Sequence, residues 1–132
     1  MFHVEHRTGP DGKFLKALVD GATWLGVPLS RALADQCSVY FRELQAWNDK
    51  TNLTAITDER EIAVKHFLDS LVCSKALDHP EQARVMDVGS GAGFPGLPLK
   101  LMHPELDMTL LEPSQKKTAF LRHVIGTLEL DH

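Results

Sequence analysis

The sequence predicts an α/β fold in which helices come first and a strand–helix–strand–helix unit follows. Up to about residue 80, apolar residues recur at steps of three and four, which is the spacing of amphipathic helices. Two short apolar runs, 85–88 and 106–111, then flank a helical segment. Strands separated by a helix usually pair in parallel through a right-handed crossover. We therefore expect a loose N-terminus over 1–12, a helical part over 13–80, and an incomplete α/β domain over 81–132.

Three amphipathic helices are expected in the helical part. The first ends at Gly26, the second runs from about Ser30 to 48–52, and the third covers about 58–77 after a capping box that begins with Asp58. The side chains expected to pack inward are Phe14, Leu15, Leu18, Val19, Ala22 and Leu25 in the first, Leu33, Cys37, Tyr40, Phe41, Leu44 and Trp47 in the second, and Ile62, Leu68, Leu71 and Val72 in the third.

The α/β part is expected to end in a fourth long helix. Ser114 is a suitable N-cap for it, and its inward face is expected to carry Ala119, Phe120, Val124, Ile125 and Leu128. A sheet of only two parallel strands leaves both edges open, whereas parallel sheets are normally covered on both faces. We therefore expect the chain to self-associate through an open sheet edge.

The segment 84–96 is the most informative part of the chain. An apolar strand, 85–88, stops in a glycine-rich turn, and Pro95 then has the fixed φ that suits the first position of a helix. Glycines let backbone amides approach a ligand closely, and a helix start adds unpaired N–H groups. The segment therefore predicts a loop that binds a nucleotide-like molecule.

Two acidic residues indicate which nucleotide would bind. The spacing Gly91-x-Gly93-x-x-Gly96 also fits a dinucleotide fingerprint, so NAD is an alternative. Asp87 at the mouth of the strand would repel a diphosphate but attract the amino group of a methionine moiety, which favours S-adenosylmethionine. Glu112, at the end of the second strand, is placed to accept a hydrogen bond from a ribose hydroxyl in either case. The structural alternative is a tight turn followed by a helix-capping acid.

Bulk properties restrict the class of protein further. The chain has 132 residues, is 43% hydrophobic and 24% charged, and carries a net charge of −4, values that fit one globular domain and argue against a broad, non-specific RNA binder. No apolar run approaches a membrane span and no secretory signal is evident, so we expect a cytosolic protein without a membrane partner. The two cysteines, Cys37 and Cys73, are expected to be buried free thiols, and the seven scattered histidines predict no metal site.

Three sequence blocks carry a resemblance to a known family: 52–56 (Asn-Leu-Thr-Ala-Ile), 65–70 (Lys-His-Phe-Leu-Asp-Ser) and 85–98, with its Asp-Val-Gly-Ser-Gly-Ala-Gly-Phe-Pro-Gly-Leu-Pro core. From about Leu29 to its last residue the chain resembles the bacterial 16S ribosomal RNA guanine-N7 methyltransferases, also called glucose-inhibited division protein B. Members of that family are longer. The resemblance implies part of a Rossmann-like, S-adenosylmethionine-dependent enzyme, incomplete after the second strand and the helix that follows it.

The resemblance also implies roles for particular residues. Gly89 and Phe94 match cofactor contacts, with Asp87 at the methionine end, Glu112 on the ribose, and Ser90, Gly91 and Gly93 in the same loop. Candidates for the RNA side, or for supporting positions behind the cofactor, are Asn52, His66, Asp69, Lys116 and Lys117. The implied partner is 16S rRNA or the small ribosomal subunit. No catalytic acid or base is expected, because guanine N7 already carries a free lone pair.

Several of these expectations have alternatives. His66, Asp69 and Ser70 share one helix face, next to which the loop at Asn52 could fold back, but a buried structural His66–Asp69 pair would explain the same spacing. A basic edge near the cofactor is expected from Lys65, His66, Lys116, Lys117, Arg122 and His123, with ordinary solvated helix faces as the alternative. For the whole chain, an NAD-dependent dehydrogenase fragment or an inactive structural module stands beside the methyltransferase hypothesis.

Overall fold

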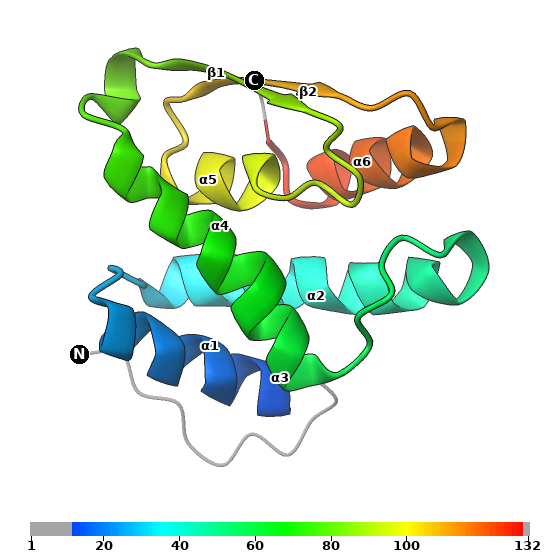
Figure 1. The fold of residues 1–132 in the computed structure, drawn as a ribbon, viewed down its shortest axis with the longest axis horizontal. Helices are drawn as coiled ribbons and strands as arrows, with labels where there is room; N and C mark the ends of the chain where they lie inside the picture. The colour runs from blue at the N-terminus through cyan, green and yellow to red at the C-terminus, as the bar shows by residue number, and fades with distance from the viewer. Residues whose placement is uncertain (1–11, 131–132) are drawn as a thin grey trace.

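The computed structural model describes residues 12–130 and stacks its elements in layers, with a two-stranded sheet on one outer side (Figure 1). Helices α5 and α6 lie directly beneath the sheet, α2 lies beneath them, and α1 is outermost. The segment labelled α4 runs diagonally across these layers. In chain order the main elements are α1 (Gly12–Leu25), α2 (Arg31–Thr51), β1 (Arg84–Val88), α5 (Gly96–Met102), β2 (Asp107–Leu111) and α6 (Gln115–Thr127).

Between α2 and β1 the chain forms one long helical segment of mixed geometry. It consists of α3 (Glu59–Glu61), the π-helical segment η1 (Ile62–Leu68), α4 (Asp69–Val72) and the 3₁₀ turn η2 (Cys73–Ala76). After a break at 77–79, a separate 3₁₀ turn, η3 (Pro80–Gln82), leads to β1. The predicted third helix is therefore confirmed in extent, although its centre is wider than an α-helix. π-helical turns often occur at functional sites, and this one carries His66.

The two predicted caps, at Asp58 and Ser114, are confirmed, and Ser30 provides a third that was not predicted. The Ser30 hydroxyl accepts a hydrogen bond from the Leu33 amide at 3.1 Å, and the Asp58 carboxylate accepts one from the Glu61 amide at 3.0 Å. The Ser114 hydroxyl accepts one from the Lys117 amide at 3.3 Å. Each cap satisfies one of the amides that a helix start leaves unpaired.

The predicted parallel strand pair is also confirmed. β1 pairs with β2 in a register that runs from Arg84 opposite Asp107 to Val88 opposite Leu111. One face of the sheet packs on α5 and α6 (Figure 1). The other face is uncovered in the described chain, so Val88 is 74% exposed, Met86 59% and Leu111 46%.

A single hydrophobic core joins the helical part to the α/β part. It contains buried side chains from both, among them Phe14, Tyr40, Phe67, Leu97 and Phe120. Two predicted core residues are wrong: Leu25 is 38% exposed because α1 ends there, and Ala119 is exposed because α6 buries Phe120, Leu121 and Val124 instead.

Two further expectations need correction. Cys73 is an exposed thiol, whereas Cys37 is buried and its burial raises its pKa to about 12. Pro95 lies one residue before α5, as its N-cap, and Gly96 is the first helical residue. The expected loose N-terminus lies outside the described residues, apart from Gly12, which begins α1. Within residues 12–130, no helix combines the length and apolarity needed to cross a membrane.

Candidate cofactor site

The glycine loop that follows β1 covers residues 89–95 and takes its shape from three left-handed glycines. Gly89, Gly91 and Gly93 have φ values of 73°, 58° and 104°, a region that side chains other than glycine rarely occupy. A Cβ added at Gly89 or Gly91 would meet no atom within 4 Å, so this side of the loop is open to an approaching molecule. At Gly93 a Cβ would lie 2.3 Å from the Tyr40 hydroxyl. That glycine is therefore required by close contact with the helical part.

The backbone amides of the loop are largely satisfied within the protein. The Gly89 and Ser90 amides donate to the Leu111 carbonyl, and the Gly93 and Phe94 amides donate to the Ser90 carbonyl. The Gly91 amide donates to the Glu112 carboxylate at 2.7 Å. These five amides are therefore not free to donate to a ligand, and the unpaired N–H groups expected at the helix start do not include that of Gly96, which donates to the Asp87 carboxylate. A diphosphate, which needs such donors, would not find them here.

Asp87 binds the first backbone amide of α5 through its side chain. Its Oδ2 accepts a hydrogen bond from the Gly96 amide at 3.1 Å, and its backbone carbonyl accepts one from the Ser90 hydroxyl at 2.9 Å. The carboxylate is half-buried, and one hydrogen bond uses only part of its capacity as an acceptor. Asp87 therefore places a negative charge where a dinucleotide-binding protein would hold phosphate, and it remains able to bind an ammonium group.

Gly96 allows the strand, the helix and Asp87 to meet closely. A Cβ at this position would lie 2.5 Å from Leu110 Cδ2 and 2.9 Å from Asp87 Oδ2. Both distances are shorter than a Cβ atom tolerates. The last glycine of the fingerprint thus serves the packing of α5 against the sheet and contributes no free amide.

Glu112 ties β2 to the glycine loop and to α6. Its Oε1 accepts the Gly91 amide at 2.7 Å, and its Oε2 accepts the Ser114 amide at 2.9 Å. These backbone hydrogen bonds, that from Ser114 first, lower the pKa of Glu112, with a smaller contribution from Lys117. The helix-capping alternative therefore applies to Oε2, which accepts the amide of Ser114, the N-cap residue of α6. Each oxygen keeps a further lone pair, so binding of a ribose hydroxyl is still possible.

The ring of Phe94 anchors the glycine loop on the helical part. It stacks on Tyr40 with a centroid distance of 5.1 Å and on His66 with a distance of 4.7 Å, both nearly parallel. It also meets Phe67 edge-on at 5.0 Å. Phe94, the predicted cofactor contact, is thus also one of the residues through which the two parts of the chain touch.

His66 connects this stack to the loop after α2. Its Nε2 lies 2.8 Å from the Thr54 hydroxyl, and the Thr54 amide donates to the Asn48 side chain at 2.8 Å. Burial lowers the pKa of His66, and the nearby charge of Asp69 opposes this shift. The loop does fold back beside His66, as expected. The alternative of a buried His66–Asp69 pair is not what forms, because Asp69 is exposed and the imidazole is bonded to Thr54.

The remaining predicted RNA-side residues fall into two groups. Asn52 is exposed and ends α2 in a left-handed conformation with φ 49°, on the same loop as Thr54. Lys116 and Lys117 begin α6 beside Glu112, with Lys116 exposed and Lys117 half-buried. Asn52 thus lies on the loop whose Thr54 contacts His66, and Asp69 follows three residues after His66 in the helical segment. The two lysines lie apart from these in sequence, in the first turn of α6 after Glu112.

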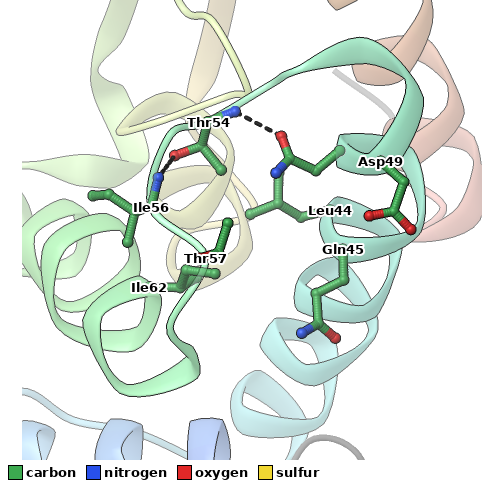
Figure 2. Close-up of a pocket in the computed structure, with 8 residues that line it drawn as sticks. Leu44, Gln45, Asp49, Thr54, Ile56, Thr57 and Ile62 are labelled. Carbon is green, nitrogen blue, oxygen red and sulfur yellow. Dashed lines mark hydrogen bonds between the residues drawn. The ribbon is translucent and has the colours of Figure 1, made fainter.

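A small pocket lies behind Thr54, between α2 and the loop that leads to η1 (Figure 2). Its volume is about 120 Å³. Its apolar walls are Leu44, Ile56 and Ile62, and its polar walls are Gln45, Asn48, Asp49, Thr54 and Thr57. Neither His66 nor Phe94 lines this pocket, so it is distinct from the stack around Phe94.

The expected basic edge is only partly present. His123 Nε2 lies 2.8 Å from the Glu43 carboxylate, and Lys65 lies 3.8 Å from that of Glu61. These acids compensate two of the predicted cations. Among the described residues, no cluster of three or more His, Cys, Asp or Glu side chains is arranged to hold a metal ion.

The parallel strand pair, the glycine loop after β1 and the helix that connects the two strands define the first part of a Rossmann-like domain. A family model described as "rRNA small subunit methyltransferase G" matches residues 33–132, and the chain belongs to this family. Similar proteins of that name occur in Roseiflexus castenholzii (54% identity over 110 residues) and Pelotomaculum thermopropionicum (45% over 116). These alignments cover 83% and 88% of this chain but 46% and 48% of the relatives, so the chain spans about half their length.

Sequence reasoning missed two residues of this site. Tyr40 was assigned to the core by helical spacing, and nothing in the sequence marks its hydroxyl as a partner of the loop. Thr54 belongs to the block 52–56 but was not singled out, although a threonine three residues after a helix end is a common local hydrogen-bonding residue. The Tyr40–Ala92 contact spans 52 positions of sequence, which local patterns do not reveal.

Proposed function

We propose that the chain forms the cofactor-binding part of an S-adenosylmethionine-dependent methyltransferase that modifies N7 of a guanine in 16S rRNA. The observation that carries this proposal is the combination of the family match with the geometry at Asp87, where a carboxylate caps α5 in place of a phosphate. A non-enzymatic structural module is the competing hypothesis for the chain by itself.

The residues present fit S-adenosylmethionine. The open side of Gly89 and Gly91 accommodates an approaching molecule without steric conflict. Asp87 can bind the methionine ammonium group and Glu112 a ribose hydroxyl, since both carboxylates have unused lone pairs. NAD fits less well, because its diphosphate would meet the Asp87 carboxylate and bonded amides.

The chemistry requires no proton acceptor from the protein. Bound S-adenosylmethionine supplies a methyl group on a positively charged sulfur, which the N7 lone pair displaces in line while the C–S electron pair returns to sulfur. No proton leaves the base, so a general base is unnecessary. The contribution of Asp87, Glu112 and the loop is to fix the methyl donor, and alignment of this kind is worth several kcal/mol.

The target guanine must be presented with its N7 edge accessible. In RNA this usually requires an unstacked base or a loop, because the major groove of an A-form helix is too narrow. We assign the RNA side to the surface around Asn52, His66 and Asp69, with Lys116 and Lys117 in the first turn of α6 as phosphate contacts. The net charge of −4 makes such local contacts more important than a general attraction to RNA.

The proposal is tested with a chimera in which this chain replaces the 110 aligned residues of the Roseiflexus castenholzii relative. The chimera should transfer labelled methyl groups from S-adenosylmethionine to small ribosomal subunits, and mass spectrometry of the digested RNA should locate the label on guanine N7. Asp87→Asn should reduce transfer, whereas Asp107→Asn, an exposed acid at the start of β2, should not. A folded chimera that leaves rRNA unmethylated would contradict the proposal.

A further inference from the structure

Tyr40 is buried at the junction between the helical part and the glycine loop. Its side chain has no exposed surface, and its hydroxyl donates to the Ala92 carbonyl at 2.6 Å, across 52 positions of sequence. Burial raises the pKa of Tyr40 well above its ordinary value, so the hydroxyl is a permanent donor. The hydrogen bond fixes the backbone of the loop between its second and third left-handed glycines.

Three contacts of Tyr40 converge on consecutive residues of that loop. Besides the hydrogen bond to Ala92, its hydroxyl occupies the space beside the Cα of Gly93, where a Cβ would lie 2.3 Å away. Its ring stacks on Phe94 at 5.1 Å with an interplanar angle of 12°. One side chain therefore restrains the carbonyl, the Cα and the aromatic ring of three successive positions.

We propose that Tyr40 is the positioning residue of the glycine loop: by holding Ala92, Gly93 and Phe94 it keeps Gly89 and Gly91 in the shape that receives S-adenosylmethionine. This inference rests on the proposed function for its ligand, but the restraint on the loop can be measured without any ligand. Tyr40 does not touch the reacting atoms. Its effect is exerted through the backbone of the loop.

The test compares two substitutions in the buried aromatic core. Tyr40→Phe keeps the ring and removes only the hydroxyl. Phe14→Leu is the matched control, because Phe14 is fully buried and contacts Phe41 and Phe67 but neither Tyr40 nor Phe94. Hydrogen exchange of the whole chain is followed residue by residue, together with urea unfolding.

Tyr40→Phe should accelerate exchange of the Gly93 and Phe94 amides about tenfold relative to the helix amides, the effect of losing one buried hydrogen bond. Phe14→Leu should lower global stability without this local acceleration. Uniform acceleration in both variants, or unchanged loop exchange in Tyr40→Phe, would overturn the proposal, since Tyr40 would then be an ordinary core residue.

A second pair of variants approaches the same contact from the loop. Gly93→Ala forces a methyl group against the Tyr40 hydroxyl, so Gly93→Ala combined with Tyr40→Phe should accelerate loop exchange by less than the product of the single effects. If the two substitutions accelerate loop exchange independently, so that their effects multiply in the double variant, this would count against the contact between Gly93 and the Tyr40 hydroxyl. If Tyr40→Phe does not fold by itself, Gly93→Ala alone decides the matter: loop exchange left unchanged by the methyl group forced against the Tyr40 hydroxyl would overturn the proposal.

Titration with S-adenosylmethionine separates this inference from the proposed function. If the wild-type chain binds it, Tyr40→Phe should weaken binding about tenfold and Phe14→Leu should leave the affinity unchanged; equal weakening would overturn the role of Tyr40 in binding. If the wild-type chain binds none, the proposed function of this chain loses its support, and the exchange rates alone decide whether Tyr40 positions the loop.

Discussion

Glu112 Oε1 accepts the backbone amide of Gly91 at 2.7 Å, and this hydrogen bond joins the end of the second strand to the middle of the glycine loop. The same carboxylate caps α6 through the Ser114 amide. A residue that sequence reasoning placed on the ribose thus already holds the site together before any ligand enters. Its structural and its proposed binding roles must be separated by experiment.

Glu112→Gln provides that separation. The substituted amide can accept one backbone N–H but presents a donor to the other, so the loop or the α6 cap loses its partner. We expect a lower melting temperature, and a weaker affinity for S-adenosylmethionine in the chimera described above. Because the folded pKa of Glu112 is lowered, its stabilising contribution is present above its unfolded pKa of about 4.3 and is lost as pH falls through the folded value.

Two measurements check this. Thermal unfolding followed from pH 7 to pH 3 should show a smaller stability difference between wild type and Glu112→Gln at the acidic end. Glu105→Gln, at an exposed acid in the turn before β2, serves as the control. A stability difference that stays constant over this pH range would contradict the assigned hydrogen bonds.

Gly96→Ala should destabilise the chain by about 1–3 kcal/mol, because the added methyl group is forced against Leu110 and Asp87. Gly126→Ala is the control. A Cβ at Gly126 in α6 meets nothing within 4 Å, and alanine is the better helix former, so this variant should gain about 0.5–1 kcal/mol. Urea unfolding of the two variants checks both signs. Equal changes in the free energy of unfolding for the two variants would show that α5 does not pack tightly against the sheet at Gly96.

His66 should make stability depend on pH near neutrality. Burial lowers its folded pKa below the unfolded value of about 6.5, so the unfolded chain binds the proton more readily. Stability is fully present above pH 6.5 and is lost as pH falls from there through the folded pKa. His66→Gln should flatten this part of the melting-temperature profile, whereas His79→Gln, at an exposed position, should leave its shape unchanged. If the melting temperature depends on pH in the same way in wild type and His66→Gln, the stability does not depend on protonation of His66.

The uncovered sheet face should cause self-association. Among residues 12–130, Met86, Val88 and Leu111 form an exposed apolar strip, and each of the two strands has one edge without a partner strand. We expect sedimentation to reveal concentration-dependent association, and Val88→Lys to reduce it without loss of stability. Trp24→Lys is the control, since Trp24 is 87% exposed on α1, away from the sheet. A wild-type monomer at every concentration would refute this prediction.

Local signals in the sequence predicted most of the fold. The caps at Asp58 and Ser114, the parallel strands and the glycine loop all follow from residue chemistry within a few positions. Periodicity failed at Leu25 and Ala119, because it does not tell where a helix leaves the core. The partners of the loop amides could not be foreseen, since the Leu111 carbonyl reaches Gly89 only through the strand register.

The shared stack of Tyr40, Phe94 and His66 has a practical consequence for dissecting the chain. A cut in the connection between the helical segment and β1 would strip the loop of its aromatic backing, so the strand–loop–strand unit could not be excised and expected to keep its shape. Grafting the glycine loop onto a foreign sheet would likewise require transplanting these aromatic neighbours with it.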